Sequence, residues 1–267
     1  MAEELQLRTH GGGKSPTVVY LPGLHGDWTL VGGFREALRG GVRWIEVTYP
    51  RRTDWSLADY ARAVDGALRK AGVERGWLLG ESFGSQVLWA MVADGGRQYA
   101  LDGLILAGGF VRHPTPALVR LARRAFAVAP LGSMVALLRA YAAVSRWRRR
   151  RSPARLAELD EFVARRNEAD RAAAAHRLRL IAEADWRPIA ARTELPVYYL
   201  TGGWDPIVPW GPVRSWLRRS CPGFRAWRRL GASDHNVLGN ASEAAAAQVL
   251  EWIAATDSLA KNDGRPE

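Results

Sequence analysis

Residues 77–84 read WLLGESFG and match the pattern G-x-S-x-G. The apolar run WLL predicts a buried strand, and the residues that follow the serine have the spacing of a helix. A chain that reverses from strand to helix in so few residues needs glycine where the backbones crowd together, and Gly80 and Gly84 meet that need. Ser82 would then lie at the apex of the turn, above the carboxyl edge of a sheet. The stretch therefore predicts Ser82 as a nucleophile.

Short apolar runs alternate with helical patterns on both sides of this stretch, which is typical of parallel βα units. The expected strands are 5–9 at an edge, 17–21, 42–48, 77–79, 101–106, 197–200 and 224–230. The expected helices are 28–39, 56–71, 83–93, 213–217 and 241–255. The predicted fold class is α/β, with a mostly parallel central sheet covered by helices on both faces.

The alternation stops between Arg112 and Arg187, where an Ala-, Leu- and Arg-rich helical pattern contains no convincing strand. This segment holds seventeen arginines and seven acidic residues, so it carries most of the net charge of +11. We therefore expect an inserted helical cap. The predicted division is a core of residues 1–111 and 188–256, a basic helical cap of residues 112–187, and a polar, frayed tail of residues 257–267.

Length and composition place further limits on the chain. Its 267 residues, 48% of them hydrophobic, are enough for one sizeable core. Cys221 is the only cysteine, so no intrachain disulfide can form, which fits a reducing compartment. Residues 1–14 lack the apolar segment of a secretory signal, and no run reaches the roughly 18 apolar residues of a membrane-spanning helix. These features predict a cytoplasmic location.

A serine hydroxyl needs a base to act as a nucleophile at neutral pH, and the base needs a carboxylate to orient it. His235 follows the last expected strand and is the predicted base. His10 and His25 lie in expected loops, whereas His113 and His176 lie in the basic insertion, where a solvated face is the ordinary expectation. The order serine, acid, histidine is the one that this type of turn uses.

Asp205 is the predicted acid because it follows the expected strand 197–200, at the carboxyl edge of the sheet. Asp234 is its rival, but residues adjacent in sequence rarely point their side chains at each other. Asp102 lies at the start of its strand, at the wrong end of the sheet. The predicted catalytic set is therefore Ser82, Asp205 and His235.

The transition state of acyl transfer carries a negative oxygen, which preorganised N–H groups stabilise. The predicted donors are the backbone amides of Phe83 and of Leu24, in the loop PGLHGD at residues 22–27. Four aromatic side chains are expected to line an apolar substrate pocket: Trp28, Phe110, Trp204 and Trp210. The chemistry requires neither a metal ion nor an organic cofactor.

Together these segments resemble the esterase- and lipase-like branch of the α/β-hydrolase superfamily, which carries a helical cap. Residues 21–26 resemble its oxyanion loop, with Pro22 where a histidine is common, and residues 80–84 resemble its nucleophile elbow. TGGWDPIVP at residues 201–209 resembles its acid turn, and SDH at residues 233–235 resembles its histidine loop. The resemblance covers about residues 15–110 and 188–255. Related branches that cleave haloalkanes and epoxides use an aspartate at the nucleophile position, where this chain has serine.

The resemblance implies hydrolysis of a carboxylic ester or related acyl compound through an acyl-enzyme. Acyl transfer and thioester hydrolysis on the same residues are alternatives. A non-catalytic binding module that docks through its basic cap is another.

The basic cap leaves three interpretations open. Its Arg120, Arg123 and Arg124 share one helical face, and residues 146–151 read RWRRRR. The opposite face holds Leu118, Leu121, Ala125 and Phe126. In the first interpretation the arginines form a solvated surface, in the second they attract an anionic substrate or carrier, and in the third they dock on an anionic membrane. Nucleic-acid binding is disfavoured because no recognition motif accompanies the charge. The sequence leaves the oligomeric state open.

Overall fold

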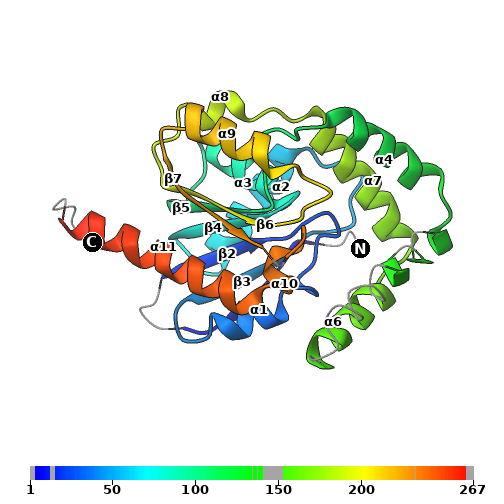
Figure 1. The fold of residues 1–267 in the computed structure, drawn as a ribbon, viewed down its shortest axis with the longest axis horizontal. Helices are drawn as coiled ribbons and strands as arrows, with labels where there is room; N and C mark the ends of the chain where they lie inside the picture. Colours follow the sequence, from blue (N-terminus) through cyan, green and yellow to red (C-terminus); the bar gives the residue numbers. More distant parts are fainter. Residues whose placement is uncertain are drawn as a thin grey trace.

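A seven-stranded sheet forms the centre of the computed structural model (Figure 1). The structure describes residues 4–12, 16–133, 135–136, 138–140, 153–231 and 233–262. The strands are β1 (Gln6–His10), β2 (Thr17–Leu21), β3 (Arg43–Thr48), β4 (Arg75–Glu81), β5 (Ala100–Ala107), β6 (Val197–Gly202) and β7 (Phe224–Leu230). They follow the order β1-β3-β2-β4-β5-β6-β7. Only β1 runs antiparallel to its neighbour, so the predicted mostly parallel sheet is confirmed.

Helices cover both faces of this sheet (Figure 1). One face carries α2 (Leu57–Lys70), α3 (Gly84–Ala93), α8 (Arg187–Ala190) and α9 (Trp210–Ser220). The other face carries α1 (Gly32–Ala37), α10 (Val237–Asn240) and α11 (Ser242–Asn262). The α/β fold class follows from this arrangement of three layers.

Two apolar layers lie on the two sides of the sheet because successive strand residues point to opposite faces. In β2, Val19 and Leu21 belong to the layer under α2 and α3, whereas Val18 and Tyr20 belong to the layer under α1 and α11. Every strand residue from Val18 to Leu21 is buried, as expected for a sheet covered on both sides.

The inserted helices whose bounds are described after β5 are α4 (Pro116–Val128), α6 (Pro153–Ala164) and α7 (Glu168–Glu183). The described part of residues 112–187 contains no strand, as the sequence predicted. Helices α4 and α7 pack against each other at one end of the sheet (Figure 1). The arginine-rich stretch at residues 146–151 lies outside the described residues.

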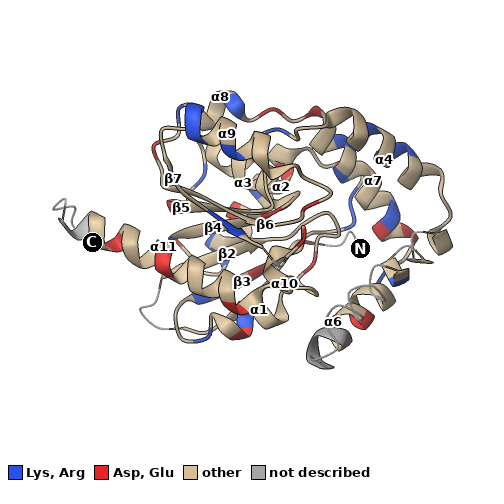
Figure 2. Ribbon diagram, viewed as in Figure 1, with Lys and Arg blue, Asp and Glu red and all other residues tan. Residues whose placement is uncertain are grey.

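Helix α4 is oriented differently from the sequence prediction. Its arginines, which colour parts of the α4 ribbon blue in Figure 2, are exposed as expected, but Leu118 and Leu121 are each 62% exposed. The side that packs inward is formed by Val119, Ala122 and Phe126. Apolar residues occupy more than half of the helix circumference, so the sequence pattern alone does not fix which part of that arc is buried.

The C-terminal helix also differs from prediction, because α11 continues to Asn262, into the segment expected to be a frayed tail. Tyr198 of β6 anchors the helix just before this extension: its ring stacks on Trp252 at 4.9 Å, and its hydroxyl lies 2.8 Å from Oγ1 of Thr256. Among the described helices, none has the length and apolar content to cross a membrane. The cytoplasmic location stays a prediction.

Replacing Ser56 with alanine tests the start of α2. The Ser56 hydroxyl accepts from the amide of Asp59 at 3.2 Å, and the Asp59 carboxylate accepts in return from the amide of Ser56 at 2.8 Å. We expect Ser56→Ala to lower the free energy of unfolding by about 1 kcal/mol in urea titrations. Ser258→Ala is the control, because this exposed serine caps no helix and its loss is expected to change stability by less than about 0.5 kcal/mol. Equal effects of the two substitutions would contradict the prediction.

Candidate active site

Ser82 occupies the turn between β4 and α3 with a backbone φ of 50°, the only positive φ among the described non-glycine residues. Its amide donates to the carbonyl oxygen of Ala107 at 3.0 Å, which fixes the turn to the neighbouring strand. A Cβ on Gly80 would lie 2.8 Å from the Cα of Ser85, and a Cβ on Gly84 would overlap the backbone of Leu21. The two glycines are therefore required by the close approach of strand, turn and helix.

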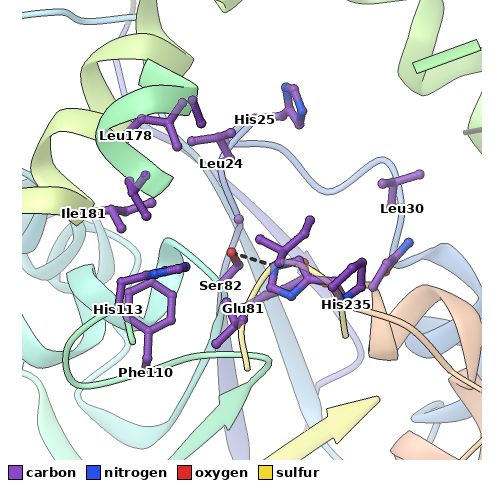
Figure 3. Close-up of a pocket in the computed structure, with 18 of the residues that line it drawn as sticks. Leu24, His25, Leu30, Glu81, Ser82, Phe110, His113, Leu178, Ile181 and His235 are labelled. Atoms are coloured by element: carbon purple, nitrogen blue, oxygen red, sulfur yellow. Dashed lines mark hydrogen bonds between the residues drawn. The ribbon is translucent and has the colours of Figure 1, made fainter. Parts of the chain in front are cut away.

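The imidazole of His235 joins Ser82 to Asp205. Figure 3 shows the hydrogen bond between His235 and Ser82 as a dashed line. Its Nε2 lies 2.9 Å from Oγ of Ser82, and its Nδ1 lies 2.7 Å from Oδ2 of Asp205. Both distances are hydrogen-bond distances, and the order nucleophile, base, carboxylate is the one needed to activate a serine hydroxyl. The structure thus brings together the three side chains proposed from the sequence.

Asp205 is oriented by its own turn. Its side chain is fully buried, and its Oδ1 accepts from the amides of Ile207 and Val208, each at 2.9 Å. Such bonds, donated by the amides that follow an aspartate to its carboxylate, are typical of a turn that begins Asp-Pro. Oδ2 is left to face the imidazole.

The two other aspartates weighed from the sequence make different contacts. Asp234 accepts from the amide of Asn236 at 3.1 Å, and Asp102 pairs with Arg75 at 2.7 Å. The carboxylate that faces Nδ1 of His235 is that of Asp205.

The charge state of His235 is set by opposing effects. Burial lowers the pKa of His235, but the hydrogen bond to Asp205 and the negative charges of Asp205, Glu81 and Asp234 outweigh it, and the pKa rises above 6.5. The Asp205 carboxylate therefore both orients the ring and stabilises its protonated form.

Sequence reasoning missed Glu81, a buried carboxyl directly before Ser82. It lines the same cavity as Ser82, and the hydroxyl of Tyr20 donates to its Oε2. Burial raises the pKa of Glu81, although the bond from Tyr20 works in the opposite direction. The sequence feature that could have indicated a buried carboxyl is the position of Glu81 as the last residue of a strand buried on both faces.

The two residues whose amides are proposed as oxyanion donors lie beside Ser82. A Cβ on Gly23 would lie 3.6 Å from Cβ of Ser82, so the loop of residues 22–27, which we call the oxyanion loop, passes next to the hydroxyl. Within the described chain, the amide N–H groups of Leu24 and Phe83 have no hydrogen-bond partner. Unpaired N–H groups at this position can donate to a negative oxygen.

A cavity of about 430 Å³ opens above Ser82, within the size range of small-molecule sites. Its apolar walls come from both the core and the inserted helices, and Figure 3 shows Leu178 and Ile181 of α7 near Ser82. The inserted helices contribute Leu118, Val119, Ala122, Phe162, Leu178 and Ile181. The core contributes Leu24, Leu30, Phe110, Ile207 and Val208, among others. Among the described lining residues none is lysine or arginine.

Of the four aromatic residues predicted to line this pocket, only Phe110 does so. Trp28 packs against the guanidinium of Arg8, 3.5 Å from its ring centroid. Trp204 is 67% exposed, and Trp210 stacks on Trp227 at 5.3 Å. The prediction for the three tryptophans is corrected, because loop position did not reveal these other partners.

The histidines of the insertion are buried rather than solvated. His113 lines the cavity, and burial lowers its pKa to about 4. His176 faces the core, where its Nε2 lies 2.7 Å from the carbonyl oxygen of Trp55. His25 also lines the cavity. Burial, and to a smaller extent the positive charge of Arg166, lowers the pKa of His25 to about 3, so its imidazole is neutral. His10 ends β1 and contacts Glu46 at 3.1 Å.

The reactive groups gathered around the cavity floor are the hydroxyl of Ser82, the imidazole of His235 and the carboxyl groups of Glu81 and Asp205. In the described ranges, no cluster of three or more side chains is suited to hold a metal ion.

A family model described as the alpha/beta hydrolase family matches residues 10–249. The fold is similar to that of an enol-lactonase from Burkholderia xenovorans LB400, with 18% identity, coverage of 94% of this chain and 96% of that one, and a TM-score of 0.76. An esterase from Thermogutta terrifontis is 20% identical, with coverage of 94% and 93% and a TM-score of 0.75. A bromoperoxidase from Bacillus anthracis is 15% identical, with coverage of 93% and 95% and a TM-score of 0.74. A search of curated proteins found no match.

The raised pKa of His235 predicts the direction of the pH dependence. If His235 takes the proton of Ser82, only its neutral form is active, so kcat/KM falls as the pH drops through the pKa of this residue. We expect an acid limb with a midpoint above 6.5, measured with an ester substrate over a pH range in which the protein stays folded.

Asp205→Asn is the matched variant for this prediction. It removes the negative charge beside Nδ1, so the midpoint should move down, and turnover should fall by about 10³–10⁴-fold because the ring loses its orienting acceptor. A rate that rises as the pH falls below 6.5 in the unchanged protein would contradict the role of His235 as a base.

Proposed function

Since this chain belongs to the alpha/beta hydrolase family, we propose that it hydrolyses a carboxylic ester or related acyl compound through an acyl-enzyme on Ser82. The observation that supports this most strongly is the pair of hydrogen bonds that link His235 to Ser82 and to Asp205. An apolar cavity open to the same hydroxyl supports an acyl substrate.

In the first half of the proposed reaction, Nε2 of His235 removes the proton of Ser82 as Oγ bonds to the acyl carbon. The carbonyl electron pair moves onto its oxygen, which the amides of Leu24 and Phe83 stabilise. Collapse of this intermediate breaks the bond to the alcohol oxygen, which leaves with the proton held by His235. The product at this stage is an ester of Ser82.

In the second half, a water molecule takes the place of the alcohol. His235 removes a proton from the water as its oxygen attacks the acyl carbon, and the same amides stabilise the second oxyanion. Collapse breaks the bond to Oγ, and Ser82 recovers the proton from His235. Asp205 stays ionised throughout and holds the imidazole in the required tautomer. Attack by another alcohol or thiol would give acyl transfer on the same residues.

The cavity supports a neutral, apolar acyl group. Two acidic residues, Asp27 and Glu81, belong to its lining, and its walls are otherwise mainly aliphatic and aromatic. Arg166, the partner of Asp27, is itself buried and is not part of the lining. A carboxylate on the buried end of a substrate would therefore lose its hydration without meeting a cation.

The described basic residues of the insertion do not line this cavity. Arg120, Arg123 and Arg124 are exposed on α4, so these three residues would meet an anionic carrier or membrane surface on the outer side of the helix. That partner remains a proposal separate from the chemistry at Ser82.

A serine-directed fluorophosphonate tests the proposed nucleophile. We expect stoichiometric labelling of the protein and turnover of p-nitrophenyl esters. Both should be lost in Ser82→Ala, because the substitution removes the hydroxyl that is hydrogen-bonded to Nε2 of His235. Ser258→Ala, at an exposed position of α11, is the control and should behave as the unchanged protein. Folded protein that neither labels nor turns over any ester or acyl-thioester would favour a binding module instead.

Paired substrates test the proposed acyl group. A p-nitrophenyl ester of pentanoic acid and the hemiester of glutaric acid have the same chain length but end in a methyl and a carboxylate, respectively. We expect kcat/KM for the pentanoate to be higher by about tenfold or more, because the terminal carboxylate would be buried without a cation. Equal values, or preference for the hemiglutarate, would show that a cation does reach the acyl site.

A further inference from the structure

Arg177 of α7 has a side chain that is almost completely buried, with 1% exposed. Its Nη1 donates to the carbonyl oxygen of Leu24 at 2.8 Å, and its Nη2 donates to that of Pro50 at 3.0 Å. Its Nε donates to the hydroxyl of Tyr60 at 3.3 Å. An inserted helix thus reaches into the core and binds the backbone of the oxyanion loop.

The guanidinium of Arg177 has no counter-ion among the described residues. Asp27, the carboxylate of the same loop, is paired instead with Arg166. A buried cation without an acidic partner is costly in desolvation free energy, even when carbonyl groups accept its hydrogen bonds. Arg177 therefore does not join the insertion to the core through an ion pair, and its burial calls for another explanation.

Arg177 also contacts the second proposed oxyanion donor. Its guanidinium carbon lies 5.9 Å from the centroid of the Phe83 ring, within the range of a cation–π contact. Tyr49 and Tyr60 surround the same guanidinium, at 5.5 and 5.9 Å. One side chain therefore touches both residues whose amides are proposed to stabilise the oxyanion, Leu24 through its carbonyl group and Phe83 through its ring.

The oxyanion loop is shaped to admit this side chain. The amide of Gly26 donates to the carbonyl oxygen of Gly23 at 3.0 Å, which closes a tight turn with Leu24 inside it. Gly26 has a φ of 79°, and a Cβ there would lie 2.5 Å from Nη1 of Arg177. The turn leaves the Leu24 carbonyl group to an outside donor, and Arg177 is that donor.

We propose that Arg177 is a positioning residue, which holds Leu24 so that its amide stays directed at the oxygen that develops charge beside Ser82. This inference rests on the proposed function, because it assigns the arginine a part in oxyanion stabilisation. Its consequence is that the inserted helix α7 helps to complete the active site as well as forming a wall of the cavity.

Arg177→Met and Arg177→Lys test the proposal with the best p-nitrophenyl ester. Methionine keeps much of the side-chain volume but donates no hydrogen bond, so kcat should fall by about 100-fold, with KM changed by less than about threefold. Lysine keeps the charge but not the fork of donors, so its kcat should lie between those of methionine and arginine. The rate of fluorophosphonate labelling should fall in parallel with kcat.

Arg171→Met is the matched control on the same helix. Its Nη1 also donates to two carbonyl oxygens, those of Phe126 at 2.6 Å and Ala127 at 3.0 Å, but these belong to α4 and not to the oxyanion loop. We expect its kcat to stay within about twofold of the unchanged protein. Melting temperatures of all variants show whether loss of rate follows loss of stability.

Added guanidinium ion separates positioning from a general structural role. In Arg177→Ala, guanidinium well below unfolding concentrations should restore part of kcat, and it should restore none in Ser82→Ala. A folded Arg177→Met or Arg177→Lys protein with unchanged kcat would overturn the proposal, as would a loss of kcat equal to that of Arg171→Met. If the unchanged protein shows no Ser82-dependent turnover, the proposed function fails first and the inference fails with it.

Discussion

The imidazole of His235 bonds side chains that lie 153 and 30 residues earlier in the chain, and the geometry of the site depends on this double contact. Neighbouring parallel strands make it possible, because their carboxyl ends meet at one edge of the sheet. Two backbone bonds then fix the acid turn against the histidine loop, from Gly203 to Leu230 at 2.8 Å and from Trp204 to Ser233 at 3.1 Å. The distance between Asp205 and His235 is therefore set by backbone contacts between loops.

The parts of the site that could be predicted from the sequence are those determined by local chemistry. Ser82 lies between glycines that the turn requires, and Asp205 precedes a proline in a turn that its own carboxylate stabilises. Strands 17–21 and 224–230 were predicted with the observed bounds, because their ends coincide with turn residues. The pairing of these strands with their neighbours in the sheet follows from the fold class. The catalytic roles of Ser82 and Asp205 remain a proposal.

The inserted helices were less predictable for a physical reason. A helix with apolar residues around more than half of its surface has several possible buried sides, and only the docking partner selects one. Leu118 is exposed and Val119 is buried in α4, although both fit the apolar pattern. The same limit applies to His113 and His176, whose burial depends on how α7 and the chain before α4 meet the core. The prediction for the indole rings failed in the other direction: Trp28 and Trp210 were expected to line the cavity, but they pack outside it.

The number of arginines in the insertion does not predict their roles, because each role depends on where the guanidinium group lies. Arg166 reaches Asp27, Arg51 of the core reaches Asp170 at 2.8 Å, and Arg177 reaches Leu24, so three buried or partly buried contacts tie α7 and its flanking chain to the core. Moving α7 away would break all three together and would expose charged groups now shielded from water. The described rim instead opens beside α4, where Leu118 and Ile207 line the cavity and remain 62% and 57% exposed. The proposed apolar acyl group would therefore enter at that rim while α7, which binds the backbone of the oxyanion loop through Arg177, stays in place.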